Sequence, residues 1–209
     1  DMIAQEAIHD SCDVRVYGTG GKPTVNVSPW SLDDRLYHTF LWGKVPENYG
    51  MSLSDDYVTE QAVKFLENTP SEPFFMLVNQ TYPHPPYAVP EPYFSMYDRS
   101  RVPFPVPPPR SFKGKPKIQR MVSGLMRMDE IADEELREIV AVYYGMITKT
   151  DRNLGMVLDA LRDSGHWNTT IVVASSDHGD FAGDYLLTEK MQNTFEDVLV
   201  NVPFAIRVP

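Results

Sequence analysis

The sequence has few of the features that mark membrane, disulfide-rich or nucleic-acid-binding proteins. Cys12 is the single cysteine among 209 residues, so no disulfide can form within the chain. We find no apolar run near the roughly 18 residues that a membrane span requires, and no signal peptide. Acidic residues outnumber basic ones, and the net charge of −10 argues against nucleic acids and anionic membranes as partners. The composition leaves the compartment and the oligomeric state open.

What is present is typical of one α/β domain. A hydrophobic content of 42% is ordinary for a globular protein of this length. Apolar residues recur at helical spacing from Ser54 to Pro70 and over residues 133–165. Short apolar runs predict three strands, at residues 74–79, 170–175 and 203–208. We expect the strands at 74–79 and 170–175 to be buried and parallel, in a mostly parallel central sheet flanked by helices.

Two regions of the chain are poor in regular patterns. Residues 1–53 contain scattered glycines, prolines and aromatic residues, which indicates loops with short elements. Residues 83–116 hold 11 of the 18 prolines, so we expect extended chain that cannot join a sheet interior. Five basic residues make the region 83–120 a proline-rich, basic loop: Arg110, Lys113, Lys115, Lys117 and Arg120. Its charges are either a solvated surface or a rim that attracts an anionic substrate.

Asp177 and His178 follow the strand predicted at 170–175, and the glycine Gly179 follows them. Open α/β sheets bind their ligands at the carboxyl ends of strands, and a glycine allows the chain to bend there. A carboxylate beside an imidazole suits Ca²⁺, Mn²⁺ or Zn²⁺. The alternative is a helix cap beside a surface histidine. Asp180 and Asp184 either join this acidic site or are exposed loop residues.

Two further side chains are candidates for contact with a substrate. His84 lies just past the strand predicted at 74–79, between prolines that restrict its backbone, so it suits proton transfer or hydrogen bonding to a substrate oxygen. Lys190 follows Asp177 by thirteen residues and could neutralise a sulfuryl or phosphoryl oxygen. Either residue could instead be structural. If the two strands are parallel, His84 and the Asp177–His178 couple meet at one edge of the sheet.

Taken together, these segments resemble the sulfatase family, within the alkaline-phosphatase-like superfamily. The resemblance rests on the order and spacing of five stretches, at residues 52–66, 73–87 (P-F-F-M-L-V-N-Q-T-Y-P-H-P-P-Y), 143–165, 168–180 (N-T-T-I-V-V-A-S-S-D-H-G-D) and 190–207. It implies an alkaline-phosphatase-like catalytic domain that is incomplete in residues 1–209. It also implies a sulfated small molecule or glycan as substrate, and a periplasmic, secreted or lysosomal location.

The resemblance implies a role for each candidate residue. Asp177 and His178 would be two ligands of one divalent cation, usually Ca²⁺ in sulfatases, which polarises the sulfate ester and holds the nucleophile. His84 would hydrogen-bond the substrate near the leaving oxygen. Lys190 would contact the sulfate oxygens and stabilise charge as the S–O bond breaks.

The chain departs from the family pattern at several positions. Sulfatases carry a Cys or Ser, any residue, Pro or Ala, any residue, Arg motif, whose first residue becomes the formylglycine nucleophile; Cys12 lies in C-D-V-R, which does not match. An early pair of metal-binding aspartates is missing, and Trp42-Gly43-Lys44 lacks the histidine of the family's G-K-W-H segment. Asp184-Tyr185-Leu186 replaces the usual histidine and glycine after the acidic loop residue. We therefore expect a central portion of a sulfatase that is inactive alone, with its formylglycine in a missing segment.

Two other functions fit the same residues. A phosphodiesterase or phosphonate monoester hydrolase of the superfamily shares the Asp-His-Gly motif and the lysine. A non-catalytic relative or binding module would lack the nucleophile altogether. The nucleophile separates these possibilities, since formylglycine favours a sulfatase and an unmodified serine or threonine favours phosphoryl transfer.

Overall fold

The structure is a computed structural model that describes residues 28–68, 73–191 and 194–209. Cys12 and the first half of the region predicted to be rich in loops lie outside the described residues. In the described part, none of the helices combines the length and the hydropathy needed to cross a bilayer. The α/β class is confirmed, because two long helices accompany two small sheets.

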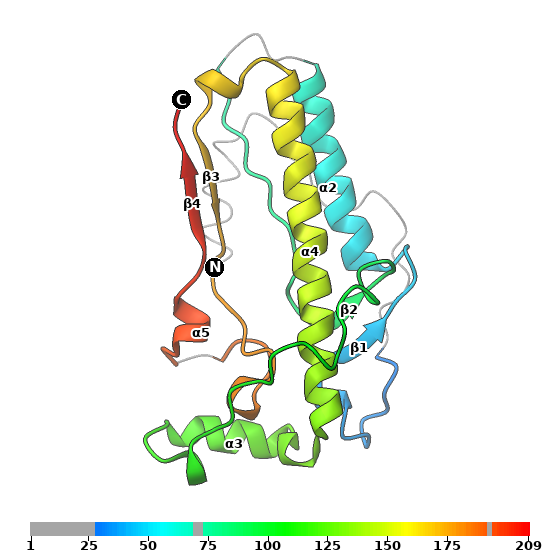
Figure 1. The fold of residues 1–209 in the computed structure, drawn as a ribbon, viewed down its shortest axis with the longest axis vertical. Coiled ribbons are helices and arrows are strands. Elements are labelled where there is room, and N and C mark those ends of the chain that lie inside the picture. The colour runs from blue at the N-terminus through cyan, green and yellow to red at the C-terminus, as the bar shows by residue number, and fades with distance from the viewer. Residues whose placement is uncertain (1–27, 69–72, 192–193) are drawn as a thin grey trace.

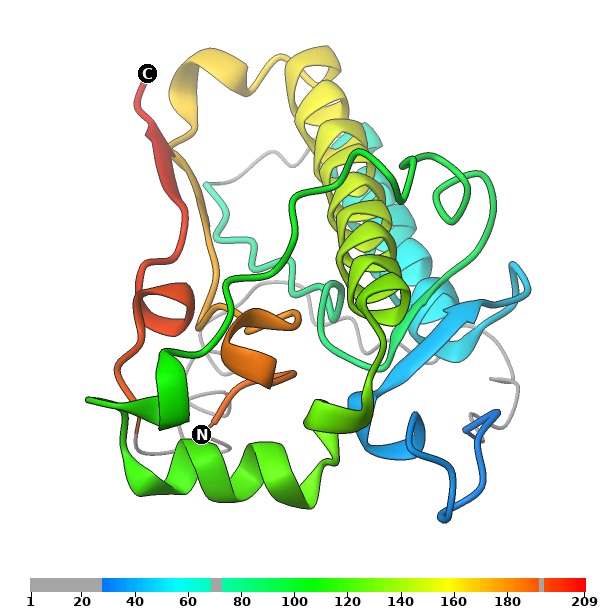
Figure 2. The ribbon, with the colours of Figure 1, turned by 60° about the horizontal axis from the view of Figure 1, so that its bottom comes forward.

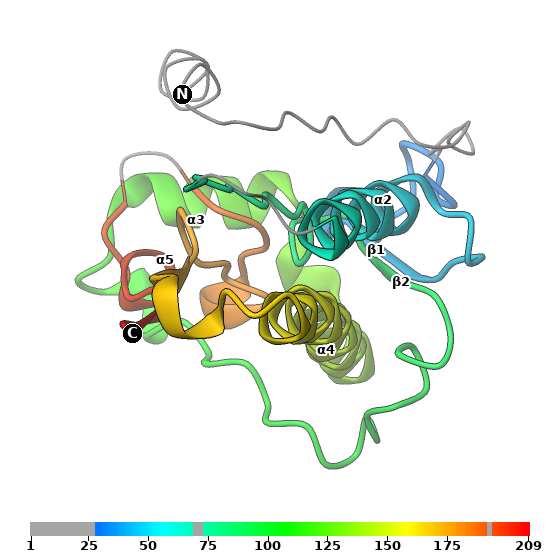
Figure 3. The same cartoon turned by 90° about the horizontal axis from the view of Figure 1, so that it is seen from above.

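Two long helices form the centre of the molecule. Helix α2 (Gly50–Glu67) and helix α4 (Asp133–Asp163) lie side by side and run in the same direction (Figures 1 and 3). The periodicity that predicted α4 is confirmed, since Ile139, Val142 and Met146 are fully buried. Helix α2 begins at Gly50, four residues before Ser54, where the helical spacing of the sequence begins, and its first turn has no side-chain cap.

A buried polar group joins the two helices. Lys149 of α4 is 2% exposed, and its ammonium group pairs with the Asp56 carboxylate of α2. The amide of Asn153 donates a second hydrogen bond to Asp56 at 3.2 Å. A buried ammonium group that loses its carboxylate partner is strongly destabilised, so this contact fixes the register of α2 on α4.

One sheet pairs strand β1 (Leu41–Lys44) with strand β2 (Tyr87–Val89) in parallel. All three residues of β2 have no exposed surface, and the strand packs against α4. Residues 83–116 therefore contribute one short strand, but each strand of a two-stranded sheet is an edge, so the expectation that they cannot join a sheet interior is not contradicted. The short strand forms because three successive residues between Pro86 and Pro90 keep their amide groups, and three are enough to pair.

The second sheet pairs strand β3 (Val172–Ser175) with strand β4 (Phe204–Arg207) in antiparallel register. Both strands were predicted from the sequence. The expectations that β3 is buried on both faces and pairs in parallel are wrong in the described residues. Val173 is 55% exposed and Ile206 is 57% exposed. An apolar run thus identified the strand without revealing its neighbours, since the sequence pattern carries no information about the partner.

Residues 73–80, which include the strand predicted at 74–79, are extended but have no ladder partner in the described part of the chain. Their exposure alternates along the segment, as in a strand with two different faces. In Figure 1 this segment and β3 run in the same downward direction, so the residues that follow both lie toward the same end of the molecule. The described strands form two separate pairs in place of one mostly parallel sheet.

The remaining elements are short. Helix α3 (Lys117–Leu125) crosses the base of the molecule, and residues 178–190, drawn in orange, lie between it and α4 (Figure 2). Helix α5 (Asp197–Val200) leads into β4. Single 3-10 turns are found at Tyr37–Thr39, Arg110–Phe112, Met128–Glu130, Trp167–Thr169 and Asp184–Leu186.

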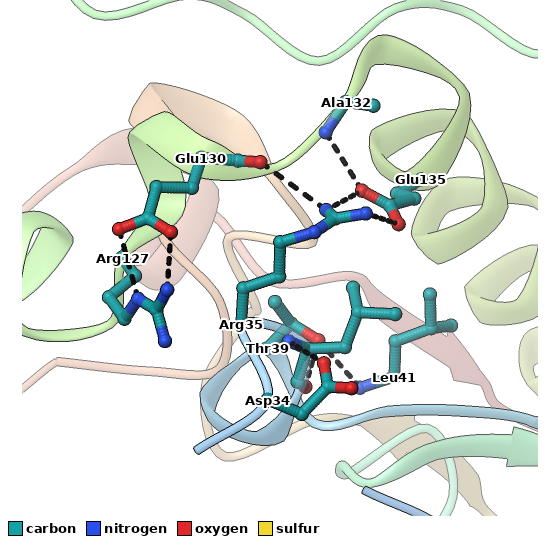
Figure 4. A network of polar contacts seen from close by, with 9 residues as sticks. Asp34, Arg35, Thr39, Leu41, Arg127, Glu130, Ala132 and Glu135 are labelled. Carbon is teal, nitrogen blue, oxygen red and sulfur yellow. Dashed lines mark hydrogen bonds and ion pairs between the residues drawn. The ribbon is translucent and has the colours of Figure 1, made fainter.

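The start of α4 is tied to the segment that precedes β1. The Arg35 guanidinium pairs with both carboxylate oxygens of Glu135, and one of those oxygens also accepts the Ala132 amide at 2.8 Å (Figure 4). Arg127 and Glu130 form a second pair beside it. One carboxylate therefore caps the helix and anchors a distant segment.

We predict that Glu135→Gln weakens this anchor in a pH-dependent way. The hydrogen bond from Arg35 lowers the pKa of Glu135 below its ordinary value. A carboxyl whose folded pKa is depressed stabilises the fold above its unfolded pKa, near 4.5, and loses that contribution as the pH falls toward the folded pKa. Chemical denaturation should give a deficit of about 0.5–1 kcal/mol at pH 7, since the pair is partly exposed.

The same deficit should shrink as the denaturation is repeated at pH values progressively below 4.5, because the wild-type carboxyl becomes protonated as the pH falls through its lowered folded pKa. Asp159→Asn is a suitable control, because Asp159 is in an exposed pair with Arg162 that anchors no second segment. A Glu135→Gln deficit that is equal at all these pH values would contradict the ion pair as its cause.

Candidate active site

The loop that carries His84 is held by a buried carboxylate of α2. Asp55 is 1% exposed and accepts the amides of Thr81 at 2.8 Å and Tyr82 at 2.9 Å. Burial raises the pKa of Asp55, and these two amides oppose that shift because they stabilise the charged form. The His84 amide then closes a turn on the Thr81 carbonyl at 2.9 Å. The position of His84 therefore depends on helix α2 and on a short, hydrogen-bonded turn.

One ring nitrogen of His84 is hydrogen-bonded to the backbone, and the other faces the neighbouring side chains. Its Nδ1 lies 2.7 Å from the Pro85 carbonyl oxygen, which can only accept, so Nδ1 carries a hydrogen. In the neutral ring Nε2 is then an acceptor, and Lys190 Nζ lies 3.1 Å from it. The structure thus brings His84 and Lys190 into contact, although 106 residues separate them in the sequence.

Glu189 completes a group of three charged or titratable side chains. Its Oε1 lies 3.2 Å from Lys190 Nζ and 3.5 Å from His84 Nε2. The side chains of His84 and Lys190 are 42% and 40% exposed, so both can be reached from solvent. We call these three residues the His–Lys–Glu cluster. An anionic ester could bind at such a cluster through its oxygens.

The buried hydroxyl of Tyr87 connects this cluster to the chain that follows β3. Tyr87 has no exposed surface; its hydroxyl donates to Asp180 at 2.6 Å and accepts the Glu189 amide at 2.8 Å. Burial raises the pKa of Asp180, and it raises that of Tyr87 well above its ordinary value. The Phe181 amide also donates to the Glu189 carbonyl at 3.0 Å. The segments 178–181 and 187–190 are thus fixed to each other and to strand β2.

Asp177 and His178 lie at the end of β3, as the sequence predicts. The Asp177 carboxylate is 85% exposed, and its Oδ2 is 3.7 Å from His178 Nε2. His178 Nδ1 lies 2.8 Å from the Gly179 carbonyl oxygen, so Nδ1 carries the hydrogen and Nε2 keeps a lone pair. Metal-bound histidines are typically oriented by such a hydrogen bond from the other ring nitrogen.

The geometry of this couple fits part of a metal site. Two ligands about 2.4 Å from one ion and roughly at right angles lie about 3.4–3.9 Å apart, which includes the observed separation. In the part of the chain that the structure describes, no cluster of three or more His, Cys, Asp or Glu side chains could hold a metal. Asp177 and His178 would therefore need further ligands. Nor does a hydrogen bond or ion pair join them directly to His84 or Lys190 among the described residues; Asp180 and Tyr87 connect the two sets.

Gly179 is required by a close approach of two segments. Its amide donates to the Leu199 carbonyl at 2.9 Å, and a Cβ at this position would overlap the carbonyl oxygen of Val198. Residues 198–199 therefore lie directly against the Asp-His-Gly turn. The sequence indicated a bend at Gly179, and the structure adds a close contact with residues 198–199 that the sequence does not reveal.

Three residues of this site were not predicted from the sequence. Tyr87 and Glu189 were not candidates. For Asp180 two interpretations remained open, a member of the acidic site or an exposed loop residue. Each one adjoins a motif: Asp180 follows Asp-His-Gly, Glu189 precedes Lys190, and Tyr87 ends the T-Y-P-H-P-P-Y stretch. Their partners are far apart in sequence, so no local pattern reveals the contacts.

The basic region near α3 has one clear structural role. Lys115 pairs with Glu196 at 2.6 Å and lies over the Tyr185 ring at 3.8 Å. This residue therefore fixes the loop before α3 to the chain before α5. The other four basic residues of the region are exposed, and their role as a rim for substrate stays a prediction.

The chain is similar in fold to solved structures of hydrolases. The chain superimposes on the phosphonate monoester hydrolase of Agrobacterium radiobacter with a TM-score of 0.60 and 28% identity, over 78% of this chain and 33% of that one. A phosphonate monoester hydrolase from Silicibacter pomeroyi gives a TM-score of 0.59 at 24% identity, over 87% of this chain and 39% of that one, and supports the fold alone. The fold is that of the alkaline-phosphatase-like hydrolases.

Within that class, the Sulfatase family model matches residues 6–209, so the chain belongs to the sulfatase family. An arylsulfatase from Clostridium perfringens is 31% identical over 162 residues, which cover 75% of this chain and 29% of the relative. The multifunctional alkaline phosphatase superfamily protein PehA of Trinickia caryophylli is 27% identical over 177 residues, which cover 78% of this chain and 34% of the relative. The chain thus spans about a third of the length of these two relatives.

We predict that Gly179→Ala destabilises the protein by about 2–3 kcal/mol, because the new methyl group must displace residues 198–199. Gly155→Ala is the matched control: Gly155 lies inside α4 with nothing within 4 Å of the added atom, so the change should stabilise by about 0.5–1 kcal/mol. Thermal or chemical denaturation of both variants measures the difference. Equal stability of the two variants would show that the close approach at Gly179 is absent.

Proposed function

We propose that this chain is part of a sulfatase that hydrolyses sulfate esters, with the His–Lys–Glu cluster and the Asp177–His178 couple on either side of the scissile bond. The observation that carries the proposal is the contact of Lys190 Nζ with His84 Nε2. It brings together two candidate substrate-binding side chains from motifs that are distant in sequence. Family membership supports the reaction class. The substrate class that we propose, sulfated small molecules or glycans, is the one that the sulfatase family implies.

Each residue has a role that its contacts support. Asp177 and His178 would hold a divalent cation, most suitably Ca²⁺, which would polarise the ester and orient the nucleophile when bound. Lys190 would donate to a non-bridging oxygen of the sulfuryl group and stabilise the charge that develops there. His84 would hydrogen-bond the leaving oxygen, and its protonated form would deliver the proton that this oxygen needs as the S–O bond breaks.

The central sheet of the family is part of the same proposal. Large apolar side chains are exposed on the strands, among them Val173 on β3 and Phe204 on β4, which is 67% exposed. Leu77 is 39% exposed on the extended segment before His84. Such surfaces are typical of strands that have further partners in a larger sheet. We infer that β3, β4 and residues 73–80 contribute to one sheet in the complete catalytic domain.

Phosphonate monoester hydrolysis is a second candidate function. It is favoured by the likeness to the Agrobacterium radiobacter phosphonate monoester hydrolase at 28% identity and by the match to PehA. The same cation and lysine could serve phosphoryl transfer. The nucleophile decides between the two reactions; the 209 residues contain no formylglycine motif, so we predict that they are inactive by themselves. A non-catalytic relative is the third possibility.

The decisive assay compares a p-nitrophenyl sulfate with a p-nitrophenyl phosphonate monoester, using the full-length product of the gene that encodes this chain. We predict turnover of the sulfate, and a loss of about 100- to 1000-fold in kcat/KM for Lys190→Ala. The loss for His84→Ala should be larger for an alkyl sulfate than for the aryl sulfate, because the poorer leaving group depends more on a proton donor.

Lys44→Ala is the matched control, since Lys44 is a lysine paired with a different glutamate, Glu91, at 3.0 Å. It should leave the kinetic constants unchanged. Turnover of the phosphonate alone would favour the second function. Full sulfate turnover by Lys190→Ala would contradict the role of Lys190, and absence of turnover with either ester, with divalent ions supplied, would favour a non-catalytic relative.

A further inference from the structure

Glu189 lies where a substrate oxygen would bind in the proposed active site. Its Oε1 is 3.2 Å from Lys190 Nζ and 3.5 Å from His84 Nε2, and those two nitrogens are 3.1 Å apart. The three atoms form a nearly equilateral triangle. An oxygen of an anionic ester that bridges the lysine and the histidine would occupy the position of this carboxylate oxygen.

The backbone of Glu189 is held in place by two hydrogen bonds, which keeps its carboxylate within reach of His84 and Lys190. Its amide donates to the Tyr87 hydroxyl at 2.8 Å, and its carbonyl accepts the Phe181 amide at 3.0 Å. Its φ is +60°, a conformation that residues with a side chain rarely adopt. Such a conformation persists only where the surroundings fix it, as the hydrogen bonds from both sides do here.

The Glu189 side chain is also sheltered more than its partners. It is 27% exposed, compared with 42% for His84 and 40% for Lys190. Charges that are partly removed from water interact more strongly than fully solvated ones. An incoming anion therefore meets one attractive ammonium group together with a repulsive carboxylate at close range.

We propose that Glu189 is a specificity-determining residue whose carboxylate competes with the substrate for the His84–Lys190 pair and selects singly charged esters over doubly charged ones. The inference rests on the proposed function and deepens it. Repulsion by a fixed negative charge scales with the charge of the ligand, so a dianion is penalised twice as strongly in free energy as a monoanion. Sulfate monoesters, phosphodiesters and phosphonate monoesters are monoanions near neutral pH, whereas phosphate monoesters are dianions.

Methyl sulfate and methyl phosphate test this inference directly, since they have similar shapes and carry one and about two negative charges at pH 8. The 209-residue chain has five histidines, so the ring signals of His84 can be assigned with a His84→Gln variant after labelling with ¹³C-histidine. The dissociation constant of each anion is then measured from the His84 signals in the wild type and in Glu189→Gln.

We expect Glu189→Gln to bind methyl sulfate roughly fivefold more tightly, as for a unit charge about 5 Å away at high effective dielectric. The gain for methyl phosphate should be roughly the square of that factor, about 25-fold, because the ligand charge doubles. A purely steric effect of Glu189 would give the same factor for both anions. Glu189→Ala, which removes the charge and the side chain together, should retain this difference between the anions.

Glu91→Gln is the matched control, because Glu91 also pairs with a lysine, Lys44, but belongs to a different surface. This variant should leave the dissociation constants of methyl sulfate and methyl phosphate unchanged. Binding of both anions with equal gains, or with none, would overturn the role of Glu189 while leaving the His84–Lys190 pair as an anion site. If neither anion shifts the His84 signals in any of the proteins, the pair is not an anion site, and both this inference and the proposed roles of His84 and Lys190 are contradicted.

Discussion

The arrangement of the candidate active site depends on one buried hydroxyl group. Tyr87 is fully enclosed, and its hydroxyl donates to Asp180 and accepts the Glu189 amide. Strand β2 thereby holds two points of the loop between the Asp-His-Gly turn and Lys190. A buried polar group is costly unless it is satisfied, so both partners must stay in place for the fold to keep its stability. The hydrogen bond from the Glu189 amide to this hydroxyl also places Glu189 and Lys190 beside His84.

The rest of the scaffold positions the other side of the site. Asp55 on α2 fixes the turn that carries His84, and the pairing of Asp56 with Lys149 fixes α2 on α4. Two adjacent aspartates of one helix thus serve different purposes: one orients a functional loop and the other joins two helices. The helices are therefore the rigid support, and the catalytic candidates lie on loops: His84 between α2 and α4, and the other candidates after β3.

The sequence predicted the parts of this structure that depend on local periodicity. Helix α4 began at the expected residue, and β3 and β4 were found where apolar runs indicated strands. The pairing of strands was less predictable. A parallel partner was expected for β3, which pairs with β4 in antiparallel register, and β2 was overlooked because its three residues lie among prolines. A run of three or four residues has too little pattern to specify its neighbour.

The candidate site was predictable to a similar degree. Both His84 and Lys190 were candidates for contact with a substrate, and the structure brings these two side chains together. Tyr87, Asp180 and Glu189 could not be inferred, because a tyrosine in a proline-rich stretch and two carboxylates beside a motif are individually common. Only their contacts across about 90 or more residues distinguish them. The metal ligands Asp177 and His178 stay a prediction.

Amide hydrogen exchange at Glu189, compared between the wild type and Tyr87→Phe, tests the central claim most directly. Phenylalanine keeps the buried ring and removes only the hydroxyl that accepts this amide. We predict that protection of the Glu189 amide falls at least about tenfold relative to interior amides of α4, which corresponds to the loss of about one hydrogen bond. Tyr97→Phe, which removes a hydroxyl bonded to Thr148, should leave it unchanged. Unaltered protection of Glu189 in Tyr87→Phe would contradict the account.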